Sequence, residues 1–346
     1  MSYQNIFIVD PLKTLAENSH HDALYNFFNH YGFSIDILNL YLSPSYTSSE
    51  NIIIKQIYKI KVFIAILINC ILIIIYQRKK IKNNFVFFPN MDWISSMIFL
   101  FARKVRLIRC NFIFRTIGIK DILTLNGFSK NIIRKLYTTL LMTGDRFSAE
   151  TLNLQSNFQN FLQSKYNVSH TPFPGFVYFA QHVFPKTGTH FLFVGNPRSD
   201  KGYLDVLRIA ESYPKLNFRI QLPNEKSLIS DWISLILCNR KNITFFAKPS
   251  SELQILLEIS QSIAVFLPYS IKKFRDRGSS IFTACVLMNK PIISSSLTSF
   301  KNESKKYGTF INISSFSGKN EIVSDAVLPN YRYMDYILNQ WRYLFR

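Results

Sequence analysis

The sequence predicts an α/β protein made of two doubly wound domains that face each other across a cleft. Short apolar runs alternate with stretches of helical periodicity along most of the 346 residues, which is typical of parallel sheets covered by helices on both faces. A segment rich in proline and glycine, residues 169–190, divides the chain into two parts of suitable length. We therefore expect domains over residues 1–175 and 190–330, followed by a helix over residues 331–346.

The first domain is expected to begin with a strand, a helix and a second strand. The apolar run Ile6–Asp10 is typical of a buried parallel strand, residues 22–32 have helical periodicity, and residues 34–40 form the next apolar run. Further strands are expected at Phe85–Pro89 and Val105–Cys110.

The most apolar stretch, Val62–Tyr76, leaves several structures open. It is shorter than the roughly 20 residues that a spanning helix needs, contains Asn69, and has basic residues on both sides. A buried helix, a pair of buried strands, a helix embedded in the membrane surface and a spanning helix are all compatible with it.

The second domain alternates more regularly. Strands are expected in the segments HFLFV, NFRIQ, NITFF, IAVFL and KPIIS, with helical segments between them. Because ligands of open α/β sheets bind beyond the carboxyl ends of the strands, the loops that follow these strands are where a site is expected.

The formal net charge of +20 suits nucleic acid, an anionic membrane face or a phosphorylated substrate. No nucleic-acid-binding module is recognisable, so no nucleic acid partner is expected. The four cysteines are far apart and no signal peptide is visible. These features predict buried thiols and a cytoplasmic protein, with peripheral contact at the anionic inner face of the membrane.

The loop in FLFVGNPRSDKG, residues 191–202, combines features of an anion site. A buried strand ends at Gly195, Arg198 and Lys201 follow, and Gly202 precedes a helical segment. Cationic side chains and helix N-termini both bind phosphates. On its own, the pattern is also typical of a surface turn with a lysine at a helix start.

A second loop, in IAVFLPYSIKKFRDRGSSIFTACVLMNKPIIS, has similar chemistry. A basic run follows its strand, and Gly278, Ser279 and Ser280 then open a helix. Serine is a preferred N-cap, so an ordinary capped helix is one interpretation, and a phosphate held by these groups is the other. Two anion sites at one sheet edge suit a nucleoside diphosphate.

Together, GNPRSDKG and LPYSIKKFRDRGSSIFTACVLMNKPII resemble the C-terminal half of group 1 glycosyltransferases, whose GT-B fold contains two Rossmann-like domains. The resemblance implies that Arg198 and Lys201 contact the diphosphate of a nucleotide-sugar donor, assisted by Ser279 and Ser280. The sequence departs from the family at Ala284, where many relatives carry a glutamate that contacts the donor.

The resemblance extends more faintly to AENSHHDALYNFFNHYG. It implies that His20 and His21 lie at the cleft as catalytic candidates, binding the acceptor or the donor sugar or acting as a general base. An exposed pair at a helix start is the alternative. Asn289 is a second departure, because it replaces the usual glycine of the segment before Pro291.

The chain contains no D-x-D, G-x-G or Walker motif, so we expect no metal and no cofactor other than the donor. The expected function is a glycosyltransferase, retaining by resemblance, that moves a sugar from a nucleotide diphosphate sugar to a glycan or lipid-linked acceptor in surface polysaccharide biosynthesis. A non-catalytic GT-B-like scaffold subunit of a glycan assembly complex is the alternative favoured by Ala284. A sugar-nucleotide epimerase of the same architecture is a third possibility.

Overall fold

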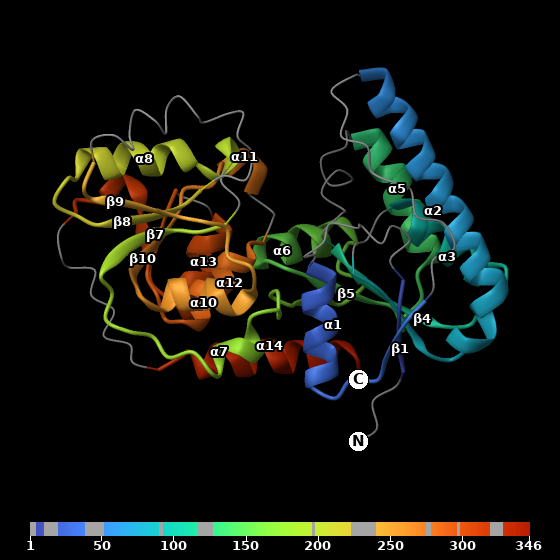
Figure 1. Ribbon diagram of the computed structural model, residues 1–346. Helices are drawn as coiled ribbons and strands as arrows, with labels where there is room; N and C mark the ends of the chain where they lie inside the picture. The colour runs from blue at the N-terminus through green and yellow to red at the C-terminus, as the bar shows by residue number, and fades with distance from the viewer. Residues whose placement is uncertain are drawn as a thin grey trace. The chain divides into compact units, whose positions relative to one another are not determined.

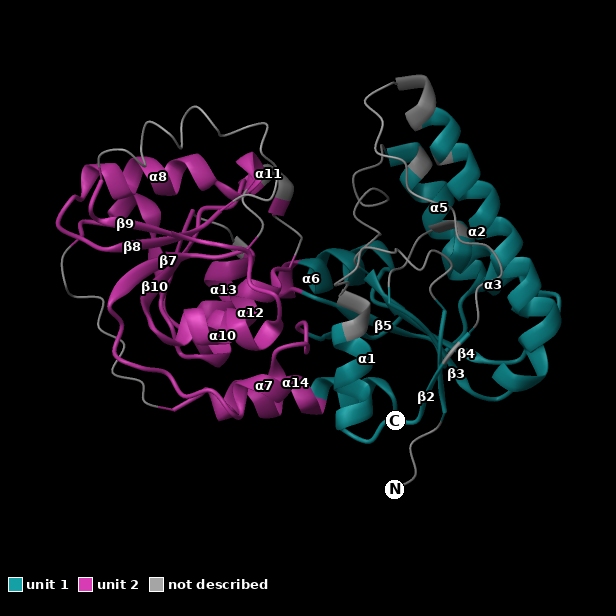
Figure 2. Ribbon diagram, in the orientation of Figure 1, with its two compact units in different colours: residues 1–150, 154–171, 340–346 teal, residues 151–153, 172–339 magenta. Residues whose placement is uncertain are grey.

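The computed structural model describes residues 5–9, 20–38, 52–89, 93–116, 127–195, 198–222, 240–274, 278–295, 298–318 and 328–346. The chain forms two compact units, shown in Figures 1 and 2. Unit 1 comprises Met1–Glu150, Leu154–Thr171 and Gln340–Arg346, and unit 2 comprises Thr151–Asn153 and Pro172–Asn339.

Unit 1 contains a six-stranded parallel sheet in the order β2-β1-β3-β4-β5-β6. This order has its topological switch point between β1 and β3. Its elements are β1 (Ile6–Ile8), α1 (His20–His30), β2 (Ile35–Ile37), α2 (Ile52–Ile81), β3 (Phe85–Phe88), α3 (Trp93–Lys104), β4 (Asn111–Arg115), α5 (Gly127–Leu140), β5 (Arg146–Ala149), α6 (Leu152–Phe161) and β6 (Val168–His170).

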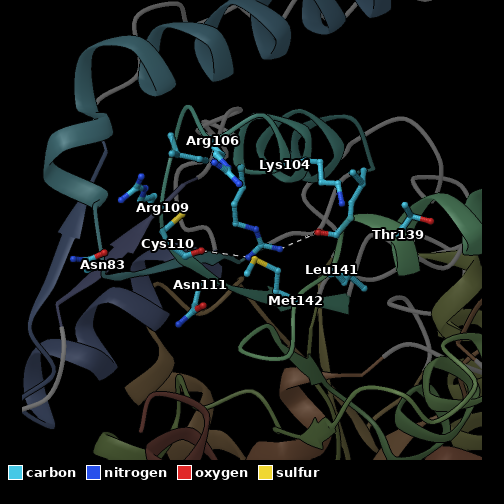
Figure 3. Close-up of a pocket in the computed structure, with 12 residues that line it drawn as sticks. Asn83, Lys104, Arg106, Arg109, Cys110, Asn111, Thr139, Leu141 and Met142 are labelled. Atoms are coloured by element: carbon cyan, nitrogen blue, oxygen red, sulfur yellow. Dashed lines mark hydrogen bonds between the residues drawn. The ribbon is translucent and has the colours of Figure 1, made fainter.

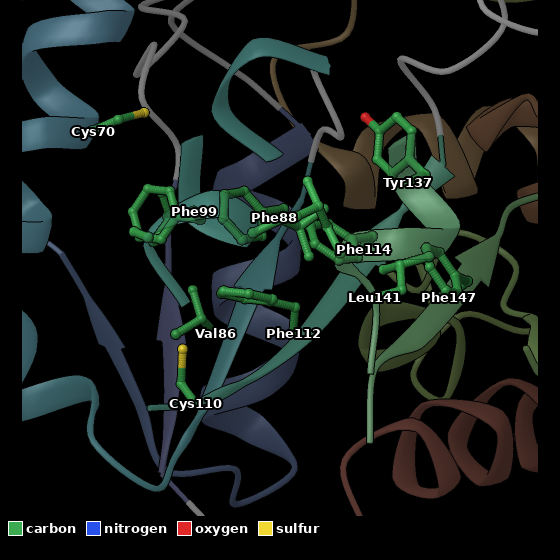
Figure 4. Packing of buried hydrophobic residues seen from close by; sticks show 14 of the residues in the cluster. Cys70, Val86, Phe88, Phe99, Cys110, Phe112, Phe114, Tyr137, Leu141 and Phe147 are labelled. Atoms are coloured by element: carbon green, nitrogen blue, oxygen red, sulfur yellow. The ribbon is translucent and has the colours of Figure 1, made fainter. Parts of the chain in front are cut away.

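Aromatic side chains fill the core of unit 1 (Figure 4). The ring of Phe88 on β3 lies 5.2 Å from that of Phe99 on α3 and 5.1 Å from that of Phe114 on β4, measured between centroids. On α14 (Tyr331–Leu344), Trp341 belongs to unit 1, and its ring centroid lies 5.5 Å from that of Phe28. The final residues therefore complete the core of unit 1.

The structure settles the stretch Val62–Tyr76 as part of one long helix, α2. The expected strand Val105–Cys110 is wrong, because these residues form the turn after α3 and β4 begins at Asn111. In that turn the Leu107 amide donates to the Ala102 carbonyl at 2.9 Å, which ends the helix.

Unit 2 contains a second parallel sheet, in the order β12-β11-β10-β7-β8-β9, with its switch point between β7 and β10. All five expected strand segments form strands. Its elements are α7 (Val177–Ala180), β7 (His190–Phe193), η2 (Ser199–Lys201), α8 (Tyr203–Ser212), β8 (Phe218–Gln221), β9 (Ile243–Phe246), α10 (Glu252–Ser260), β10 (Ser262–Leu267), α11 (Ile271–Phe274), α12 (Ser280–Leu287), β11 (Ile292–Ser294), α13 (Thr298–Tyr307), β12 (Phe310–Asn312), η3 (Ile313–Ser315) and the first part of α14.

Candidate functional site

Gly195 ends the chain segment that leaves β7. Its φ of +106° is a conformation that side chains of L-residues rarely adopt, and its amide donates to Gln221 Oε1 at 2.8 Å. A Cβ at this position would lie 3.5 Å from Lys201 Nζ and 3.4 Å from Ile281 Cγ1. The backbone at Gly195 therefore lies beside both the lysine ammonium and the first turn of α12.

Gly202 joins η2 to α8 and packs on the end of β10. Its φ is +68°, and a Cβ there would come within 2.3 Å of the Pro268 carbonyl oxygen. The Ser270 amide donates to the Asp200 carbonyl at 2.8 Å. These contacts hold the loop after β7 against the loop after β10, on the two sides of the switch point.

Lys201 is the central cation of the site. Its pKa is lowered to about 8, mainly by burial and also by the nearby charge of Arg198, whereas Asp200 partly offsets these two effects. Its ammonium lies 5.5 Å from the ring centre of the buried Tyr269. Arg198 Nε lies 3.1 Å from Asp200 Oδ1, with the arginine side chain half exposed.

The N-terminus of α12 also approaches Tyr269. The Tyr269 hydroxyl is 3.4 Å from Ser279 Oγ, which accepts the Phe282 amide at 3.3 Å as the helix N-cap. Ser280 is the first residue of the helix. Lys201, Tyr269 and Ser279 thus form one continuous group, and Gly195 contacts the same helix through Ile281.

This arrangement suits an anion with two phosphates. The amides at the start of α12, which have no acceptor within the helix, and the positive end of its dipole favour negative charge, and the ammonium of Lys201 adds to them at the same edge. Arg198, with its half-exposed guanidinium, can add charge-assisted hydrogen bonds to phosphate oxygens.

The structure explains one of the two departures from the expected motif, Asn289. Asn289 has a φ of +51°, the left-handed conformation that glycine would adopt, and its Nδ2 donates to the Leu328 carbonyl at 2.9 Å. Lys290 is buried and donates to the Lys186 carbonyl at 2.7 Å, so it supports the fold rather than the site. Ala284 is fully buried in α12.

No protein family model and no curated protein sequence matches the chain. Solved structures do. A glycosyltransferase from Rickettsia africae ESF-5 aligns with a TM-score of 0.59 at 13% identity, over 98% of this chain and 88% of that one. The lipopolysaccharide outer core galactosyltransferase WaaB aligns with a TM-score of 0.54 at 14% identity, over 99% and 96%. The chain has the GT-B fold. A structure of S. aureus TarM aligns with a TM-score of 0.52 at 13% identity, over 80% of this chain and 59% of that one.

In this GT-B chain, His20 and His21 form the first turn of α1, after β1 at the switch point of unit 1. Their side chains lie outside the described part of the structure, so their catalytic role stays a prediction. The basic run at residues 275–277, and Asn196 and Pro197, also lie outside the described residues.

Two residues of the site were not assigned from the sequence. Gln221 is 2% exposed and binds the Gly195 amide, and Tyr269 lies near both Lys201 and Ser279. A polar residue that ends an otherwise apolar strand, as Gln221 does in NFRIQ, is the signal that could have pointed to it.

Proposed function

We propose that the protein transfers a sugar from a nucleotide diphosphate sugar to a glycan or lipid-linked acceptor in surface polysaccharide biosynthesis. The observation that carries the proposal is the convergence of Lys201, Arg198 and the N-terminus of α12 at the switch point of unit 2. The fold neighbour TarM, which was crystallised with UDP and alpha-GlcNAc-glycerol, supports this class of donor and acceptor.

The residues of the site would act on the leaving diphosphate. The ammonium of Lys201 and the amides of α12 are fixed before the reaction, so they can stabilise the charge that develops when the glycosidic bond to phosphate breaks. We propose that this neutralisation needs no metal ion and that transfer retains the anomeric configuration. His20 or His21 would act on the acceptor side in unit 1.

A panel of UDP, GDP and ADP sugars tests the proposal, first by thermal shift and then by donor hydrolysis. One nucleotide should raise the Tm, and Arg198→Ala with Lys201→Ala should abolish the shift. Lys215→Ala removes an exposed lysine elsewhere on unit 2 and should leave the shift intact. Absence of a shift with every nucleotide would contradict the proposal.

The alternative is a non-catalytic scaffold with the same fold. Ala284 favours it, because the first turns of α12 supply no carboxylate toward the donor sugar. A protein that binds a nucleotide sugar but neither hydrolyses nor transfers the sugar, with any acceptor extract tested, would support this alternative.

A membrane-bound acceptor would require the protein to work at a membrane. The net charge of +20 suits the anionic inner leaflet, and we propose peripheral contact there by a cytoplasmic protein. This contact does not depend on the chemistry at Lys201.

A further inference from the structure

A basic pocket opens at the edge of unit 1 where the strands begin (Figure 3). It has a volume of about 680 Å³ and is lined by the segments that precede β3, β4 and β5. It therefore lies at the edge opposite to the one at which ligands of such sheets bind. A smaller pocket of about 320 Å³ shares Arg106 and Arg109 with it.

Six exposed cations line these two pockets. We call them the basic cluster: Arg78, Lys79, Lys82, Lys104, Arg106 and Arg109. No acidic side chain lines either pocket among the described residues. Beneath them, Arg103 is already neutralised by Asp145, with both guanidinium–carboxylate distances at 2.6 Å.

Helix dipoles explain only part of the basic cluster. Cations in the last turns of α2 and α3 stabilise those helix ends. Arg106 lies beyond α3 with a φ of +63°, where glycine is favoured and a side chain is strained. Its amide donates to the Arg103 carbonyl at 3.0 Å to close the turn. Glycine could close this turn without strain, so the turn itself does not require an arginine. The presence of Arg106 therefore points to a role for its side chain.

An exposed apolar stripe leads directly to the basic cluster. Residues three or four apart on α2 share one face, and we call this set the α2 stripe: Ile57, Ile60, Ile64, Leu67, Ile71 and Ile75. The same spacing continues to Arg78 and Lys82. The stripe is about 27 Å long at 1.5 Å per residue.

The surface extends over the neighbouring helices. α3 packs between α2 and α5, and Figure 1 shows the three side by side. On α5, Phe128, Ile132 and Leu136 are exposed on one face, with Phe128 78% exposed. Phe101 on α3 is also exposed. Several large apolar side chains exposed on three neighbouring helices are more than the scattered single residues of an ordinary surface, which favours an interaction site.

α2 is long and apolar enough to cross a membrane, with a mean hydropathy of 2.4 over its best window. Its other face is part of the core, however, where Ile66, Cys70 and Ile73 are at most 5% exposed. Crossing a bilayer would pull these residues out of the unit. The helix can instead lie in the plane of the interface with its exposed face toward lipid.

We propose that unit 1 docks on an anionic phospholipid membrane, with the α2 stripe in the boundary between headgroups and acyl chains and lipid phosphates bound by the basic cluster. The cations and the apolar stripe adjoin, as the phosphate and the chain of a phospholipid do. The inference rests on the membrane contact proposed above and not on the donor site.

Flotation of the full-length protein with vesicles tests the proposal. Vesicles of phosphatidylglycerol and phosphatidylcholine should carry the protein upward, whereas pure phosphatidylcholine should not. Arg106→Gly with Arg109→Gln should weaken partitioning roughly 30-fold. Lys215→Gln with Lys241→Gln removes two exposed cations from unit 2 and should have little effect.

Arg106→Gly separates binding from folding, since glycine relieves the strain at this position and should leave the Tm unchanged or higher. Arg106→Lys keeps the positive charge and should partition like the wild type. If Arg106→Gly with Arg109→Gln floats like the wild type, the basic cluster is not the lipid site and the proposal is overturned.

Ile64→Gln with Ile71→Gln tests the α2 stripe against Leu253→Gln with Leu257→Gln, which change exposed residues of α10 in unit 2. Only the first pair should reduce flotation.

Soluble glycerol 3-phosphate tests whether the basic cluster binds a small phosphate instead of a membrane. If the protein binds glycerol 3-phosphate as tightly as it binds vesicles, the site is one for a small phosphate and docking is overturned. Arg198→Ala should float normally, so failure of the donor site and failure of docking are distinguishable.

Discussion

The two units contain parallel sheets of six strands but concentrate cations at opposite edges. In unit 2, Lys201 lies at the carboxyl edge beside the N-terminus of α12, so the ammonium and the helix dipole attract the same anion. In unit 1 the basic cluster lies at the amino edge, where helix C-termini carry partial negative charge. The first arrangement suits a small, tightly held diphosphate. The second suits a broad anionic surface that many cations contact weakly.

Removing the buried carboxylate below the basic cluster should produce the largest effect. Asp145 accepts hydrogen bonds from Arg103, from the Phe112 amide at 3.0 Å and from the Met142 amide at 2.9 Å. Asp145→Ala should lower the free energy of unfolding by about 4 kcal/mol, because it leaves a buried charge uncompensated. Urea unfolding followed by circular dichroism measures this.

The matched control for that change is Asp36→Ala. Asp36 pairs with Lys80 at 2.5 Å, but both side chains are about half exposed, so the loss should stay below about 1 kcal/mol. Equal effects of the two substitutions would mean that the buried pair contributes no more than the exposed one.

The turn that positions Lys201 should be the next most sensitive feature. Gly202→Ala combines a φ of +68° with a Cβ 2.3 Å from the Pro268 carbonyl oxygen, and should cost roughly 3 kcal/mol. Gly32→Ala in unit 1 has a similar φ of +73° but open space around it, so only the backbone strain of about 1 kcal/mol is expected. Thermal unfolding measures both variants, and the difference between their losses of stability gives the cost of the steric clash at Gly202.

The pH dependence of nucleotide binding should report on Lys201. With a pKa of about 8, the ammonium is largely charged at pH 7, and about a tenth remains charged at pH 9. The affinity for UDP or the preferred nucleotide should therefore fall up to about tenfold over this range. Calorimetric titration with Lys201→Arg should give a flat profile, and a flat wild-type profile would contradict the role of Lys201.

The lowered pKa of Lys201 also makes stability depend on pH, but in the opposite direction to nucleotide affinity. The folded protein releases the Lys201 proton near pH 8, whereas the unfolded chain holds it until near the ordinary pKa of 10.5. The unfolded state therefore binds more protons in this window, and the contribution of Lys201 to stability rises with pH.

The smallest effect is expected at Asn289. Asn289→Gly removes the strain of a φ of +51° and also removes the 2.9 Å hydrogen bond to Leu328, so the stability should change by no more than about 0.5 kcal/mol. Asn289→Ala loses the hydrogen bond and keeps the strain, and should cost about 1 kcal/mol. Denaturant midpoints compare the two.

The fold class was predictable because the alternation of apolar runs and helical segments survives along the chain. β6 and β12 were missed. Val168–His170 overlaps the start of the segment expected as a linker, and Phe310–Asn312 is a run of three residues with a polar end. The prediction of a strand at Val105–Cys110 failed because a helix-ending turn with several apolar residues has the same sequence pattern as a short strand.

The site could be predicted only as separate loops. Gly195, Lys201 and Gly202 share one motif, and the sequence already indicated that Ser279 begins a helix at the same edge. The contacts through Tyr269 and Gln221 join different strands. Such contacts depend on strand order, which the sequence alone did not give.

Trp341 and Phe345 pack into unit 1 although unit 2 ends only at Asn339. During synthesis the first strands leave the ribosome long before these two aromatic residues, which close the core over Phe28 and Phe87. Unit 1 is therefore made first but finished last, and the usual order of folding from the N-terminal domain onward is reversed for its final step. An excised fragment ending at Thr171 would need residues 340–346 supplied as a separate peptide to reach the same structure.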